Sequence, residues 1–137
     1  METRHRVRTG DARDLSLEDD SVELVVTSPP YPMIEMWDDI FAALDPAIAD
    51  ALAAGDGDHA FSLMHDVLDS VWAELARVLV PGGIACINVG DATRSLSDGF
   101  RQYPNHAEIT TRLTDHGLRA LPDILWRKPT NSGAKFM

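Results

Sequence analysis

The chain has 137 residues and a net charge of −10, and 45% of its residues are hydrophobic. That length allows one small domain with a hydrophobic core. No apolar run is long enough to cross a membrane, and the first residues lack the apolar stretch of a signal peptide, so we expect a cytoplasmic protein without membrane contact. The single cysteine, Cys86, excludes an internal disulfide, and its apolar neighbours predict that it is buried.

The acidic charge is unusual for a protein that handles nucleic acid, because phosphate contacts normally require Lys and Arg. Arginine outnumbers lysine ten to two, and aspartate outnumbers glutamate sixteen to six. Short acidic side chains with few lysines fit a high-salt cytoplasm, where a Debye length of about 3 Å at 1 M salt weakens self-repulsion. An ordinary acidic protein fits the composition equally well, and both interpretations stay open.

The N-terminal part of the sequence predicts short elements. Alternation over 4–8 predicts a short strand that ends in a turn, and a polar link over 14–21 follows. The apolar run Val22–Val26 is typical of a short buried strand. The Ala-rich stretch 38–54 contains Pro46, so we expect two short helices there.

A long amphipathic helix over about 59–79 is the clearest element, and Asp58 is its candidate N-cap. We expect Pro81-Gly82-Gly83 to end this helix. Its apolar residues recur at steps of three and four and form one stripe: Phe61, Met64, Leu68, Val71, Trp72, Leu75 and Leu79.

A strand over 84–89 follows, and then a helix over 106–116 that Asn105 caps and Gly117 closes. The final segment, 118–126, is expected to be extended. Strands that alternate with helices predict an α/β fold with a mostly parallel sheet and flanking helices, in a single domain over 1–137.

The motif Ser28-Pro29-Pro30-Tyr31 stands directly after the strand Val22–Val26. Proline has no N–H group and a fixed φ, so backbone carbonyls near the two prolines stay available as acceptors. Ser28 adds a side-chain oxygen, and Tyr31 adds a flat ring on which another ring can stack. These residues predict a pocket for a planar ring with an exocyclic amino group, and the alternative is an ordinary proline-rich turn.

This motif resembles the signature of the DNA amino-methyltransferases, which transfer a methyl group from S-adenosylmethionine to an exocyclic amine of DNA. The resemblance implies a partial Rossmann-like methyltransferase fold and a catalytic site at Ser28, Pro29, Pro30 and Tyr31. A Ser at the first position is most often linked to N4 of cytosine. The target base would be flipped out of the duplex and stacked on Tyr31. Restriction-modification is the setting that the resemblance suggests.

Gly10-Asp11-Ala12 precedes the strand that carries the motif. In the family a segment of this type binds the cofactor, which implies that Asp11 accepts from an adenine amino group and that the Ala12 N–H donates to a ring nitrogen. The alternative is an Asp that caps the following turn. Asp91 ends a later strand, where it could approach the ligand, but capping of the next turn is the better interpretation.

Trp126 and Lys128 resemble a Trp-x-Lys segment of the family, which implies that they bind the DNA substrate at the base pocket and at phosphate. A buried Trp and a solvated Lys are the alternative. The five histidines show no metal-binding spacing, so we expect no metal. No Pro-Cys nucleophile occurs, which argues against methylation of a cytosine ring carbon.

Two parts of the family pattern are missing: the glycine-rich cofactor loop and the target-recognition region. We therefore expect an incomplete domain, a fragment or one piece of a split enzyme that needs a complementing methyltransferase half and shows little methyl transfer alone. The alternatives are an N6-adenine DNA methylase, an RNA or protein amino-methyltransferase, and a non-catalytic remnant or accessory module of a methylase.

Overall fold

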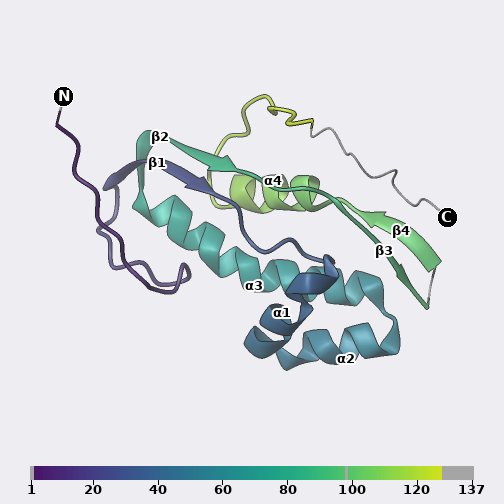
Figure 1. Ribbon diagram of the computed structural model, residues 1–137. Coiled ribbons are helices and arrows are strands. Elements are labelled where there is room, and N and C mark those ends of the chain that lie inside the picture. The colour runs from purple at the N-terminus through teal and green to yellow at the C-terminus, as the bar shows by residue number, and fades with distance from the viewer. Residues whose placement is uncertain (1, 98, 128–137) are drawn as a thin grey trace.

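Two parallel strands and a long helix form the centre of the molecule (Figure 1). The computed structural model describes residues 2–97 and 99–127. Its elements, in chain order, are β1 Val22–Thr27, the 3-10 helix η1 Glu35–Trp37, α1 Asp38–Leu44, α2 Pro46–Ala54, α3 Gly57–Val78, β2 Leu79–Ile87, β3 Ala92–Leu96, β4 Gly99–Tyr103 and α4 Asn105–Asp115.

Strands β1 and β2 pair in parallel, and α3 runs from the α1–α2 pair back to the start of β2 (Figure 1). The register places Thr27 opposite Ile87, and the Asn88 N–H continues the ladder by donating to the Thr27 carbonyl at 2.8 Å. β3 and β4 form a separate antiparallel hairpin. The predicted α/β class is confirmed.

The sequence predicted a helix to about residue 79 that Pro81-Gly82-Gly83 ends. In the structure this segment lies inside β2. α3 ends at Val78, and Leu79 already pairs with Val22. The register then shifts, so that Leu24 pairs with Ile84. Proline disfavours a helical conformation in the residue before it, which explains the earlier end of the helix. Gly83 is required here, since an added Cβ would lie 2.9 Å from the Val80 carbonyl oxygen.

Pro46 separates α1 from α2 as predicted, and Asp45 caps α2 by accepting from the Ala47 N–H at 3.0 Å. The N-cap of α3 is Asp56, which accepts from the His59 N–H at 3.1 Å, and not the expected Asp58. Asp58 is the second residue of the helix and pairs with Arg101 of β4 at 3.0 Å.

The core lies where α3 meets α1, α2 and α4. Its fully or almost fully buried side chains come mostly from the predicted stripe on α3 and from the helices around it: Met33, Phe41, Ile48, Ala60, Met64, Leu68, Trp72, Leu75 and Ile109. Val25, Ala85 and Ile87 of the sheet pack against this core. No helix in the described residues is long and apolar enough to cross a membrane.

Two further local predictions are wrong, and one hairpin was not predicted. Residues 4–8 form no strand and are exposed, because no neighbouring strand in the described residues pairs with them. The β3–β4 hairpin was not expected, since its Thr-Arg-Ser sequence lacks a clear apolar alternation. Cys86 is exposed rather than buried, because nothing among the described residues covers its face of the sheet. Residues 118–127 are irregular and exposed except for the half-buried Leu118.

Asn105 joins α4 to the two loops that follow β1 and β2. It is fully buried and starts α4, so it does not act as the expected N-cap. Its Nδ2 donates to the Pro32 carbonyl at 3.0 Å and to the Gly90 carbonyl at 3.1 Å. Its Oδ1 lies 3.1 Å from Nε2 of the fully buried His65 on α3. The predicted C-terminal glycine of α4 is confirmed, because Gly117 has a φ of 91°.

The His65 ring is neutral. Because Asn105 Oδ1 can only accept, His65 Nε2 carries the proton, and Nδ1 is left buried without a partner. A second proton would place a charge in the core with no acceptor beside it. Burial therefore lowers the pKa of His65 to about 4 and outweighs the hydrogen bond with Asn105 and the nearby acidic groups, which raise it.

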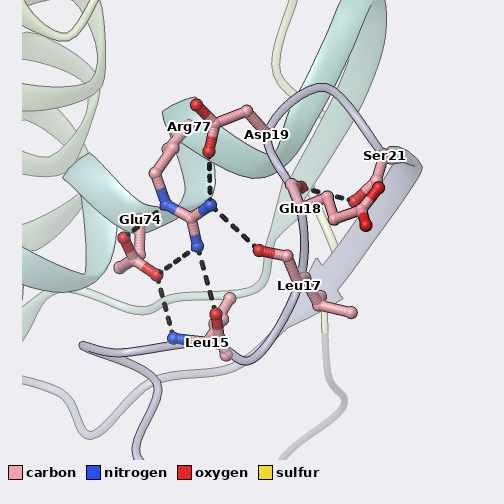
Figure 2. A network of polar contacts seen from close by, with 7 residues as sticks. All are labelled: Leu15, Leu17, Glu18, Asp19, Ser21, Glu74 and Arg77. Carbon is pink, nitrogen blue, oxygen red and sulfur yellow. Dashed lines mark hydrogen bonds and ion pairs between the residues drawn. The ribbon is translucent and has the colours of Figure 1, made fainter.

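Arg77 anchors the N-terminal segment to the end of α3 (Figure 2). Its guanidinium donates to the carbonyls of Leu15 and Leu17 at 3.1 and 3.0 Å and pairs with Asp19 at 2.6 Å and with Glu74 at 2.8 Å. Glu74 also accepts from the Leu15 N–H at 2.9 Å. The hydrogen bonds from Arg77 and Leu15 lower the pKa of Glu74 to about 2, so this network persists at ordinary pH.

We predict that Arg77→Met loosens residues 14–19 without unfolding the domain, because the side chain supplies their contacts while the Asp20 and Ser21 N–H groups stay bonded to the helix backbone. Hydrogen exchange followed by mass spectrometry should show faster exchange at Leu15 and its neighbours. Arg119→Met, which removes the same charge from an exposed position, is the control. Unchanged exchange in Arg77→Met would contradict the anchoring role.

We predict that the free energy of unfolding falls as the pH drops from about 6.5 towards 4, because the unfolded chain binds a proton at His65 that the folded chain excludes. The loss attributable to this residue is at most about 3 kcal/mol. Urea titrations at several pH values should show a shallower pH dependence in His65→Gln, which does not titrate. Ser62→Ala, at an exposed position on the same helix, should keep the wild-type slope.

Candidate active site

The motif after β1 and the residue after β2 meet at one edge of the sheet. Because β1 and β2 are parallel and Thr27 pairs with Ile87, Ser28 and Asn88 leave the sheet side by side. Ser28 Oγ lies 3.1 Å from the Tyr31 hydroxyl, and Asn88 Nδ2 donates to these oxygens at 3.4 and 3.3 Å respectively. The three side chains form a closed polar cluster at the carboxyl ends of the strands, where open α/β sheets bind ligands.

Exposure differs along the motif. Ser28 is exposed and Tyr31 is half-buried, whereas Pro29 is buried. Among the described residues, no N–H or side-chain donor bonds the Pro29 carbonyl. The motif therefore has an exposed side-chain oxygen at Ser28 and, at Pro29, a backbone acceptor that no donor in the described residues occupies. Both are acceptors of the kind that an amino group requires.

Asp11 and Pro30 line the same cavity, which has a volume of about 150 Å³. The apolar side chains around it come from α1 and α3. The structure thus brings one predicted cofactor-binding residue next to the motif. A cavity of this size is below the roughly 300–1,000 Å³ of ordinary small-molecule sites, so it can hold only part of a large ligand.

Asp11 has local partners of its own. Its carboxylate accepts from the Arg13 backbone N–H at 2.9 Å and from the Arg13 guanidinium at 2.7 Å. The hydrogen bonds from the Arg13 side chain and backbone lower the pKa of Asp11 to about 2, so the carboxylate is charged. This is the geometry of a turn cap, and a ligand amine would have to share or replace the contacts with Arg13. Ala12 is exposed.

A strained residue, Met33, lies two positions after the motif. Met33 has a φ of 66°, a left-handed conformation that non-glycine residues rarely adopt, and its side chain is 1% exposed. Its N–H donates to the Met64 sulfur at 3.3 Å, while Asn105 holds the preceding Pro32 carbonyl. A cavity of about 390 Å³ opens beside this loop and is lined by residues 33–35 and 93–96, but by no residue of the motif.

The sequence predicted that Asp91 caps the turn that follows it, but its carboxylate bonds instead to the first turn of α4. Its carboxylate accepts from the backbone N–H of His106 at 3.2 Å, from His106 Nδ1 at 2.7 Å and from Gln102 at 2.8 Å. Burial alone would raise the pKa of Asp91, but these hydrogen bonds outweigh it and keep the pKa below its usual value. Asp91 thus fixes the start of α4 beside Asn105.

The predicted substrate residues are not joined to the motif. Trp126 is 70% exposed, follows α4 in the 118–127 segment, and lines neither of the two cavities. Lys128 lies outside the described residues. Within those residues, no group of three His, Cys, Asp or Glu side chains is placed to hold a metal ion.

Sequence reasoning missed the two asparagines that organise this site. Asn88 lies at the end of a predicted strand, and its position at the same sheet edge as Ser28 was the available signal. Asn105 was interpreted as a helix cap, and only the packing of α4 against α3 shows that its amide faces inward. Both residues act through contacts with segments more than 50 positions earlier in the chain.

The sequence pattern of the DNA methylase family N6_N4_Mtase matches residues 22–136. The chain is also 46% identical to the Type II methyltransferase M.MthZI of Methanothermobacter thermautotrophicus and 46% identical to the Type II methyltransferase M.MjaI of Methanocaldococcus jannaschii. These matches cover 100% and 98% of this chain, but only 39% and 48% of the relatives. The chain therefore spans less than half the length of either curated relative.

Solved structures show the same likeness. A Thermus thermophilus protein assigned as a DNA modification methylase is 35% identical, with a TM-score of 0.63 over 91% of this chain and 44% of that one. A structure of that protein complexed with S-adenosyl-L-methionine has a TM-score of 0.60 at 29% identity, over 89% of this chain and 57% of that one. The chain belongs to the N6_N4_Mtase family of DNA methylases.

Proposed function

We propose that this chain is the catalytic portion of a DNA methyltransferase that modifies the exocyclic N4 amine of cytosine, with S-adenosylmethionine as the methyl donor. The observation that carries the proposal is the cluster of Ser28, Tyr31 and Asn88 beside the unused Pro29 carbonyl. The cluster is exposed at Ser28 and stands at the ligand-binding edge of the sheet. Membership of a DNA methylase family supports the choice of reaction.

The acceptors are suited to orient an amine. With the Ser28 hydroxyl directed to Tyr31 and Asn88 donating to one Ser28 lone pair, the other lone pair is available. One amine N–H would bond this lone pair, and the second would bond the Pro29 carbonyl. These hydrogen bonds would make the nitrogen more tetrahedral, so that its lone pair leaves conjugation with the ring and becomes available to the methyl donor. The nitrogen would then form the new N–C bond as the C–S bond of the methyl donor breaks, which leaves S-adenosylhomocysteine, and the amine would release a proton to solvent.

S-adenosylmethionine, when bound, supplies an electrophilic methyl group on sulfur, so the chain itself needs no covalent intermediate. The residues that fit part of this cofactor are Asp11 and the apolar walls of the cavity that Asp11 shares with Pro30. Asp11 is charged and exposed, so it can accept from an adenine amino group in place of Arg13. The contribution of the chain is positioning and electrostatic preorganisation.

Cytosine N4 is preferred over adenine N6 because the first residue of the motif is Ser28, a neutral acceptor, rather than an Asp. The stacking face for the flipped base is Tyr31, whose hydroxyl is held by Ser28 and Asn88 and whose ring lies beside Gly90. A fixed ring loses little freedom when a base stacks on it. Stacking of this type is worth about 1–3 kcal/mol per base.

The test is transfer of labelled methyl from S-adenosylmethionine to DNA, followed by mass analysis of the nucleosides. We expect little incorporation by the 137-residue chain alone, and N4-methylcytosine when the chain is fused to the segment of the Methanothermobacter relative that it does not match. N6-methyladenine would contradict the proposed base. A folded fusion that binds S-adenosylmethionine but yields no methylated nucleoside would contradict the function itself.

In the same fusion, Ser28→Ala should lower kcat about 10- to 100-fold, the range expected for one lost hydrogen bond to the reacting amine. Tyr31→Ala should weaken base stacking by about 1–3 kcal/mol, while Tyr31→Phe, which keeps the ring, should lose much less. Ser62→Ala, at an exposed position on α3, is the matched control. Wild-type kcat in Ser28→Ala would remove Ser28 from the site.

A further inference from the structure

One face of the β1–β2 pair is apolar and uncovered. The outer sheet face consists of Leu24 and Val26 on β1 and Ile84 and Cys86 on β2. Leu24 pairs with Ile84 and Val26 with Cys86, so the four side chains form one continuous patch. Leu24, Val26 and Ile84 are 55%, 71% and 46% exposed, and Cys86 is exposed as well.

The opposite face of the same strands is covered. Val25, Ala85 and Ile87 alternate with the outer residues and pack against the core. Parallel sheets are normally covered on both faces, and their strands then contain continuous apolar runs, as Leu24–Val26 and Ile84–Ile87 do. The sequence of these strands is thus that of a sheet with two covered faces, and the described residues cover one.

The described C-terminal segment does not cover the outer sheet face. Its apolar side chains, Leu121, Ile124 and Leu125, are themselves 68%, 93% and 92% exposed. A second copy of the chain is a poor occupant, because a net charge of −10 opposes self-association. The curated relatives point to another occupant. The match to this chain covers only 39% and 48% of their lengths, so more than half of each relative lies outside it.

We propose that the outer sheet face is the docking surface for the methyltransferase segment that the relatives contain and this match does not. The docked segment would bury Leu24, Val26, Ile84 and Cys86 and would complete the domain on the side away from α3. The docking chemistry is the same whether the segment belongs to the same polypeptide or to a separate one. The inference rests on the family membership that also underlies the proposed function.

Cys86 provides the readout, because it is the one cysteine of the chain and lies within the patch. The unmatched segment of the Methanothermobacter relative, with any cysteines replaced by serine, is the probe, both co-expressed with the chain and fused to it. We expect a thiol reagent to modify Cys86 readily in the chain alone and at least tenfold more slowly in the complex and in the fusion. This readout involves no methyl transfer, so its failure is distinguishable from failure of the proposed function.

A matched pair of variants tests the face directly. Val26→Thr keeps the shape of the side chain but buries a hydroxyl on docking, and it should weaken the complex about tenfold. Val7→Thr makes the same change at a position that is 97% exposed and outside the sheet, and it should bind like the wild type. Circular dichroism of the isolated chain should be unchanged by both substitutions.

Several results would overturn the proposal. Cys86 that stays fully reactive in a folded fusion would show that the face is not buried. Equal binding by Val26→Thr and Val7→Thr would place the contact elsewhere. Protection of Cys86 that rises with the concentration of the chain alone, together with dimers in sedimentation, would assign the face to a second copy of this chain.

Discussion

The parallel pairing of β1 with β2 is the constraint on which the candidate site depends. It places the residue after Thr27 beside the residue after Ile87, so Ser28 and Asn88 become neighbours although 60 positions separate them. A register slip of one residue would turn the side chains of a strand to the opposite face. The shift at Pro81–Gly83 occurs at the far end of the ladder, so the paired residues from Leu24 to Thr27 are in continuous register up to the site.

The loops around the site are held by one type of contact. Side-chain amides, carboxylates and a guanidinium form hydrogen bonds with backbone groups of distant segments. Asn105 holds the loops after both strands, Asp91 holds the first turn of α4, and Arg77 holds the segment that leads to β1. Backbone groups in loops have no strand or helix partners and would otherwise depend on water. These contacts leave the Pro29 carbonyl without a donor among the described residues, which suits a group that receives one from a substrate.

The sequence was informative where the signal is local. The α3 stripe, the break at Pro46 and the strand before Ser28 follow from residue spacing, and the structure has all three. The β3–β4 hairpin was missed although Asp98-Gly99 is a dipeptide typical of hairpin turns, because the flanking residues are polar. The role of Asn105 could not be predicted, since its partners are set by tertiary packing, whereas the place of Asn88 at the sheet edge was a signal for its role. Cys86 was expected to be buried because its neighbours in the sequence are apolar.

The large sequence separation between Asn105 and its partner Pro32 also affects when this part of the chain can fold during synthesis. The Pro32 carbonyl that it binds lies 73 residues earlier in the chain, and a ribosome adds about 5–20 residues each second. Several seconds therefore pass between synthesis of the motif and synthesis of Asn105, whose amide holds the loop after the motif. During that interval the left-handed Met33 lacks part of the support that compensates for its strain. The loop that follows Ser28 is thus fixed late in biosynthesis, although Ser28 itself is translated early.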